Sequence, residues 1–188
     1  MSYKKWILVS AVLFAVSIAI GVTLTLVIPD SIIISLFHED IAAFQEQLSW
    51  ILAQPQFLIC IFIFIKNVSA MLLSFVFSPI LCLMPILSLI VNGGILGFVS
   101  VSVAEEKSLG FVLAGLLPHG IFGIPALIIG QAAALSFGAM AMLALIRKGK
   151  RSLLLPNLKQ NLRYLLLALA LLLPAAIIET YLTPLLIT

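Results

Sequence analysis

The chain has 188 residues, of which 63% are hydrophobic and only 9% are charged. A soluble domain carries about a quarter charged residues, and its interior cannot hide so much apolar surface. This composition therefore excludes a soluble protein and predicts a multi-pass membrane protein. At about 20 residues per span, it predicts an all-α transmembrane bundle of about five spans. Residues 1–188 form a single transmembrane domain, and a net charge of +3 calls for no nucleic-acid partner.

The first predicted span covers residues 6–28, after Lys4 and Lys5. Its apolar run is longer than the roughly 7–15 residues of a signal-peptide core, so we expect it to stay uncleaved. In residues 30–56, apolar positions recur at helical spacing among acidic and amide residues. This pattern predicts an amphipathic helix on the outer membrane surface, where it offers a contact for a protein partner.

The remaining spans are predicted at residues 57–77, 80–103, 109–146 and 164–187. The run 109–146 makes a helix about 57 Å long, whereas the bilayer core is about 30 Å thick. Pro118, Gly120 and Pro125 therefore mark a predicted break near residues 118–125. We expect the part before the break to be a re-entrant or lead-in half helix, and the part after it to be the true span.

Basic residues set the predicted orientation. Six of the ten fall between Arg147 and Arg163, and Lys4 and Lys5 precede the first span. Because cytoplasmic loops are enriched in Lys and Arg, the N-terminus and the loop after residue 146 are predicted to be cytoplasmic. A single crossing by residues 109–146 satisfies this rule. The C-terminus and residues 30–56 then lie outside.

Strongly polar residues within the spans are the candidate site. They are Lys66, Asn67, Asn92, His119, Gln131 and Glu179. Lys66, Asn92 and His119 each lie roughly 13–18 Å from a membrane edge, close to the midplane. Such residues usually face a bundle interior. Two uses stay open: a polar core that contacts a small solute, ion or proton, or hydrogen bonds that hold helices in register. An ion pair between Lys66 and Glu179 is a further option.

Metal, cofactor and catalytic sites are not predicted. His119 can contact a proton or solute, or donate to carbonyls freed by Pro118 and Gly120. It has no partner for a metal, because the other histidine lies in the surface segment. Cys60 and Cys82 are expected as small buried hydrophobes. The serines of the spans have no base beside them in sequence, so we expect no enzymatic activity.

Small residues also recur on helix faces. Gly93 and Gly97 lie in the third span, and Gly130, Ala134 and Gly138 follow at intervals of four in the long run. Such faces permit close helix–helix contact. The contact lies either within the monomer or across a homodimer.

Three segments in order resemble the stage II sporulation protein M family of prokaryotic membrane proteins. They are Asn92-Gly93, Leu117-Pro118-His119-Gly120, and Glu179 with Thr183-Pro184. The resemblance implies a multi-pass protein of the plasma membrane of a bacterium or archaeon. The named member resembles a scaffold that holds cell-wall-degrading partners. The family usually has a glutamate a few residues after the histidine, where this chain has Gly123.

Two functions follow from these features. The first is a non-enzymatic membrane scaffold or assembly subunit, which predicts a partner on residues 30–56. The alternative is a small permease or channel-like transporter that uses the polar midplane residues. This alternative predicts a cavity that reaches Asn92 and His119.

Overall fold

The computed structural model describes residues 3–28 and 53–186, except for the side chain of His119. Its elements are α1 (Tyr3–Val27), α3 (Gln56–Val76), α4 (Leu83–Glu106), α5 (Leu109–Ile146), η1 (Lys148–Leu153), α6 (Leu154–Ile177), η2 (Ile178–Leu182) and α7 (Thr183–Leu186). Most of the predicted surface segment, at residues 29–52, lies outside this description.

A helical membrane bundle is confirmed. Five stretches in the described residues are long and apolar enough to cross a bilayer. The outward faces of the helices carry exposed apolar side chains, among them Val16, Leu72 and Leu166. Exposed apolar surface of this extent suits contact with lipid.

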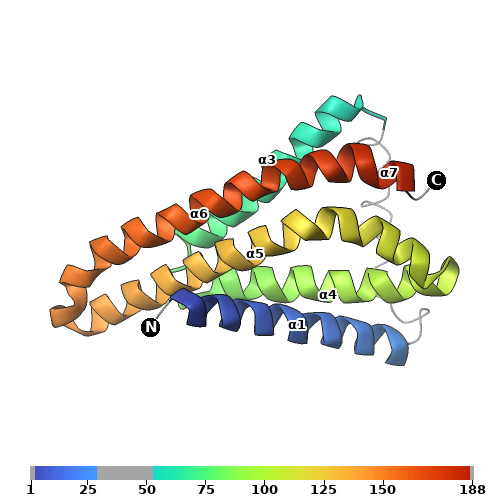
Figure 1. Cartoon of the computed structure of the whole chain (residues 1–188). Coiled ribbons are helices and arrows are strands. Elements are labelled where there is room, and N and C mark those ends of the chain that lie inside the picture. The colour runs from blue at the N-terminus through green and yellow to red at the C-terminus, as the bar shows by residue number, and fades with distance from the viewer. Residues whose placement is uncertain (1–2, 29–52, 187–188) are drawn as a thin grey trace.

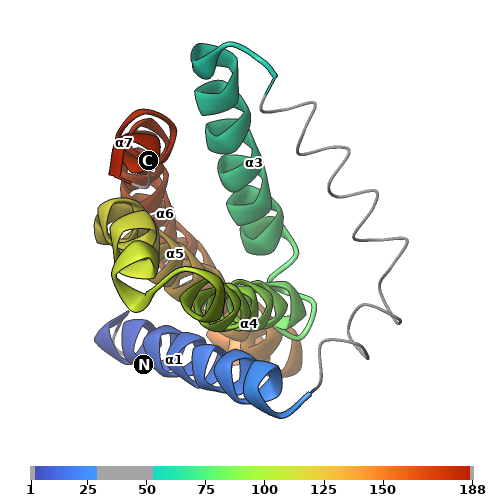
Figure 2. The ribbon, with the colours of Figure 1, turned by 90° about the vertical axis from the view of Figure 1, so that its right-hand side faces the viewer.

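Helices α1 and α4 lie side by side along their length (Figures 1 and 2). A Cβ atom at Gly97 of α4 would meet the backbone carbonyl of Ile18 in α1, and one at Gly93 would lie 2.7 Å from Ser17 Cβ. Gly21 of α1 meets the backbone of α4 in the same way. Small residues thus let the two backbones approach closely.

Helix α5 is the centre of the bundle and packs against α1, α3, α4 and α6. Its small residues between Ala126 and Ala134 are buried, with Ala134 1% exposed. Gly130 faces Met71 of α3, and Gly138 faces Ser78 and Cys82 in the α3–α4 turn. Both small-residue faces predicted from sequence are therefore used within the monomer.

The long apolar run is one helix that bends. Ser108 begins α5, since its Oγ accepts a hydrogen bond from Phe111 N at 3.2 Å. Pro118 and Pro125 lie inside the helix, and each removes a backbone donor. Figure 1 shows the bend in this part of α5, and both halves advance in the same direction along the bundle. The first half is thus a lead-in, and Gly120–Ile146 has the length of a span.

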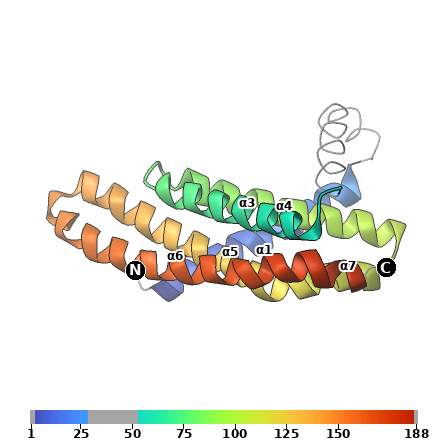
Figure 3. The same cartoon turned by 90° about the horizontal axis from the view of Figure 1, so that it is seen from above.

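Charge separates between the two ends of the bundle. The α5–α6 hairpin extends beyond the start of α1 and beyond the α3–α4 turn (Figures 1 and 3), and η1 at its tip is basic. Glu105, Glu106 and the end of α7 lie at the opposite end. Segments predicted to be cytoplasmic therefore share one end. Which end faces the cytoplasm stays a prediction.

Cysteine labelling tests this orientation. We expect Gly149→Cys in η1 to react with a membrane-impermeant maleimide only after cells are opened, and Glu105→Cys to react in intact cells. Both positions are exposed. The native background should be low because Cys60 and Cys82 are buried. The reverse labelling pattern would invert the topology.

Two alanine substitutions in α4 test the α1–α4 contact. Gly97→Ala places a Cβ against the α1 backbone, whereas a Cβ at Gly94 has no atom within 4 Å. Overpacking predicts a loss of about 1–3 kcal/mol in unfolding free energy for Gly97→Ala, and little change for Gly94→Ala. Unfolding of the purified protein in mixed detergent micelles measures both. Equal stabilities would contradict the described contact.

Candidate functional site

A cavity of about 470 Å³ lies among the helices, mainly between α3, α4 and α5. This size falls within the roughly 300–1,000 Å³ of small-molecule sites. Its described lining is mostly apolar and carries no charged side chain. The residues that line it are Phe14, Asn67, Ala70, Met71, Ser88, Asn92, Leu96, Leu116, Leu117, Gly120, Ile121, Gly123, Ile124, Leu127, Gln131 and Leu172.

A chain of polar side chains crosses three helices beside this cavity. Ser74 Oγ of α3 donates to Gln131 Oε1 of α5 at 2.6 Å. Gln131 Nε2 donates to Ser88 Oγ of α4 at 2.9 Å. Asn92 Nδ2 then donates to Ser88 O at 2.7 Å. We call Ser74, Gln131, Ser88 and Asn92 the polar chain. Gln131 is only 1% exposed and uses both ends of its carboxamide to join α3 to α4.

Two amides at the cavity keep unused hydrogen-bonding capacity. No described residue donates to Asn92 Oδ1 or hydrogen-bonds the Asn67 side chain. Asn92 is exposed near the middle of α4, a membrane-length helix. An amide group that faces hydrocarbon without a hydrogen-bond partner raises the free energy of the protein. A carboxamide presents both donors and acceptors, so the cavity suits water or an uncharged polar molecule.

Helix α3 forms one wall of the cavity through Asn67, Ala70 and Met71. Figure 2 shows that α3 reaches α4 through the turn at residues 77–82. The opposite wall comes from the bent part of α5, where Gly120, Gly123 and Ile124 line the cavity. Gly123 stands where the sequence resemblance implies a glutamate, so this position brings no carboxylate to the cavity. The bend of α5 therefore shapes the site.

The structure brings together half of the predicted polar residues. Asn67, Asn92 and Gln131 all line the cavity. Lys66 is exposed on α3 and does not line it, and no ion pair joins Lys66 to Glu179 in the described part of the chain. His119 lies in α5, but its side chain is outside the description. Of the predicted break residues, Gly120 lines the cavity, while Pro118 and Pro125 do not.

Glu179 occupies a separate polar position. It is partly buried in η2, a π-helical turn, and makes its own contact within the protein. The backbone N–H of Thr183 donates a hydrogen bond to Ile178 O, and this bond closes the wide turn. Turns of this kind are rare and occur often at functional sites. Glu179 is therefore a second candidate position, outside the cavity.

Sequence reasoning missed Ser74 and Ser88. Both were seen as serines without a base, and their partner proved to be an amide from another helix. One signal was available, since Asn67, Met71 and Ser74 share one face of α3 by helical spacing, and Ser88 lies four residues before Asn92. The pairing across helices required the register between α3, α4 and α5.

Comparisons with known proteins identify a family that matches most of the chain. A family model described as Stage II sporulation protein M matches residues 10–184. An uncharacterized protein of Methanocaldococcus jannaschii is 35% identical over 100 residues, which make up 52% of this chain and 56% of that protein. The match therefore spans about half the length of this relative. No solved structure matches the chain.

A double-mutant cycle tests the polar chain. Ser74→Ala and Gln131→Leu should couple by about 0.6–1.7 kcal/mol in unfolding free energy, the range for hydrogen bonds between membrane helices. Ser17→Ala with Gln131→Leu serves as the control cycle, because Ser17 Oγ donates to Leu13 O within α1. We expect no coupling there. Equal coupling in both cycles would rule out the Ser74–Gln131 bond.

Proposed function

The chain belongs to the stage II sporulation protein M family, and from this premise we propose that it is a non-enzymatic, small permease or channel-like membrane protein for an uncharged polar solute. The observation that carries the proposal is the cavity with its polar chain. It reaches Asn92, one of the two residues that the permease hypothesis expects at a cavity, and Asn67 and Gln131 also line it. The other expected residue, His119, has its side chain outside the description.

The chemistry of the lining favours a neutral solute. An ion that leaves water needs opposite charge or a ring of oxygen ligands, and the described lining has only amides and hydroxyls among apolar groups. Asn67 and the free Oδ1 of Asn92 supply donor and acceptor to the solute. The apolar remainder, including Leu116 and Ile124, suits its carbon skeleton.

The bent part of α5 forms one wall of this site, and we expect its bend to change during transport. Transporters commonly build midplane sites from interrupted helices, and α5 bends where Gly120 and Gly123 line the cavity. Glycines let neighbouring groups approach without a side chain in the way. A change in the bend would alter both the width of the cavity and its access to solvent.

The surroundings of the hydroxyls support a non-enzymatic role. Nucleophilic serines require a base in hydrogen-bond reach. Ser74 donates to an amide oxygen, and Ser88 accepts from amide nitrogens. These contacts join helices, and neither of the two hydroxyls has a base as its partner.

The scaffold hypothesis stays a prediction. Its expected contact with a partner falls on residues 30–56, and most of that segment lies outside the described residues. A homodimer and a partner on the outer side are likewise expectations from sequence. The cavity gives the permease proposal a specific observation in its favour.

Solute flux into liposomes tests the proposal. Purified protein should carry at least one of a panel of uncharged solutes, with radiolabelled urea and glycerol as the first probes, faster than protein-free liposomes do. Asn67→Leu should lower that flux by about tenfold, as expected for the loss of roughly one desolvated hydrogen-bonding group that contacts the solute. Its stability should change little, because no described residue hydrogen-bonds the Asn67 side chain.

A matched pair of serine substitutions separates a loss of flux at the cavity from a general loss of folding. Ser88→Ala removes a member of the polar chain, whereas Ser10→Ala removes a fully buried hydroxyl without a hydrogen-bond partner in the described structure. We expect Ser88→Ala to lower flux and Ser10→Ala to leave it unchanged. Equal flux with and without protein, across the panel, would contradict the permease function.

A further inference from the structure

A second hollow, of about 610 Å³, lies on the outer face of α6 near the hairpin end. It is lined by Pro156, Lys159, Gln160, Arg163, Tyr164 and Leu167. These positions follow the spacing of one helical face. The hollow lies on a different element from the polar chain and shares no lining residue with the cavity described above.

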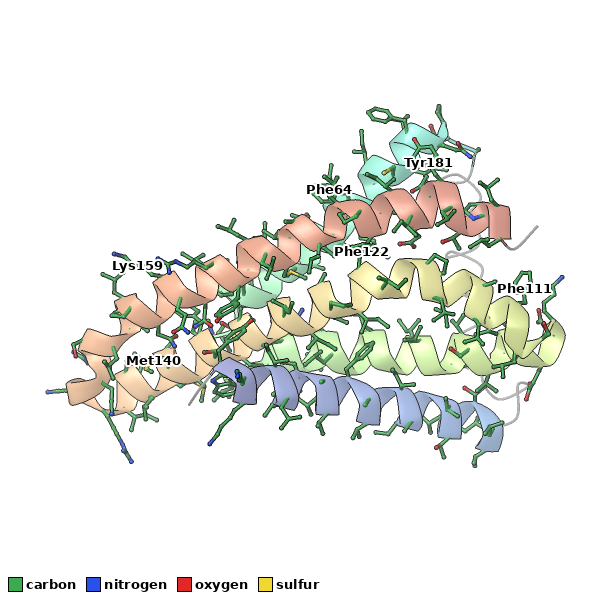
Figure 4. All side chains as sticks on the ribbon, viewed as in Figure 1. Phe64, Phe111, Phe122, Met140, Lys159 and Tyr181 are labelled. Carbon is green, nitrogen blue, oxygen red and sulfur yellow. The ribbon has the colours of Figure 1, made fainter. Side chains whose placement is uncertain are left out.

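The two cations of this hollow have no neutralising partner in the described structure. Lys159 and Arg163 are both exposed and lie one helical turn apart, an arrangement that is mutually repulsive. The described carboxylates, Glu105, Glu106 and Glu179, belong to the opposite half of the bundle. Figure 4 shows Lys159 pointing away from the bundle. An anion bound between these two side chains would relieve the repulsion.

The hollow lies where the surface of α6 changes from basic to apolar. Tyr164 stacks on Tyr3 of α1, with ring centroids 3.4 Å apart and planes 5° apart. Tyrosine is enriched at membrane–water interfaces. Beyond this pair, α6 exposes Leu166 and Leu167, which is 49% exposed. Along α6, basic residues are thus followed by a tyrosine and then by exposed leucines. A lipid leaflet has the matching order, with charged headgroups first and acyl chains below them.

We propose that this hollow binds the headgroup of an anionic phospholipid. Lys159 and Arg163 bind the phosphate oxygens, as paired basic residues at a membrane surface can do. Gln160 offers a hydrogen bond to the remainder of the headgroup, and an acyl chain follows the apolar face past Leu167. The stacked tyrosines hold α1 against α6, so the site is fixed relative to the bundle.

Lipid exchange in nanodiscs tests the proposal. The full chain is placed in phosphatidylcholine with phosphatidylglycerol, then extracted, and retained lipids are counted by native mass spectrometry. We expect selective retention of phosphatidylglycerol. The double variant K159Q/R163Q should bind it about 30-fold more weakly, from roughly two charge contacts. Helix content by circular dichroism checks that the variant folds.

The control variant K148Q/K150Q removes equal charge from η1, which does not line the hollow. At about 1 M salt the Debye length is about 3 Å, so diffuse attraction is screened. The control should then match the wild type while K159Q/R163Q does not. Equal losses in both variants would overturn the site. Displacement of the lipid by inorganic phosphate alone would also overturn it, by showing a phosphate site without lipid preference.

Discussion

The bundle depends on close contact between backbones, because lipid tails are as apolar as the side chains of the helices and so give no hydrophobic drive for the helices to associate. Three glycines let α1 and α4 touch, and two more let α5 receive Met71 and the α3–α4 turn. The hydrogen-bonded carboxamide of Gln131 then sets how the packed helices are aligned with one another. Gln131 binds one serine on each neighbouring helix, and so fixes the relative height of α3 and α4.

The need for close backbone contact also explains why a cavity remains between the helices. Helix α3 meets the bundle through Met71 and Ser74 and through the turn that seats on Gly138, and its N-terminal half has few buried residues. A bent α5 adds to the separation, since its two halves cannot both follow a straight neighbour. The space that results is lined by Asn67, by Ser88, Asn92 and Gln131 of the polar chain, and otherwise by apolar groups.

Much of this arrangement was predictable from sequence, since apolar runs, glycine spacing and charge asymmetry are local signals. The helical bundle and the family followed from them, and three of the polar residues meet at the cavity. Lys66 shows the limit. It neighbours Asn67 in sequence, yet one step along a helix turns a side chain by about 100°. Depth alone therefore could not tell which of the two faces inward. Ser74 and Ser88 required the register between helices, which no single helix carries.

The contact between Tyr3 and Tyr164 joins the first helix to the last long one, and Tyr3 Oη also donates to Ile129 O of α5 at 2.9 Å. During synthesis the N-terminal helix enters the membrane well before either partner exists. Its glycine face can meet α4 first. Its N-terminal end gains the hydrogen bond from Tyr3 to Ile129 only once α5 has been made, and the stack on Tyr164 only once α6 has been made. The stack of Tyr3 on Tyr164 is therefore among the last contacts that the bundle can form, and it fixes the start of α1 once the other long helices have been made.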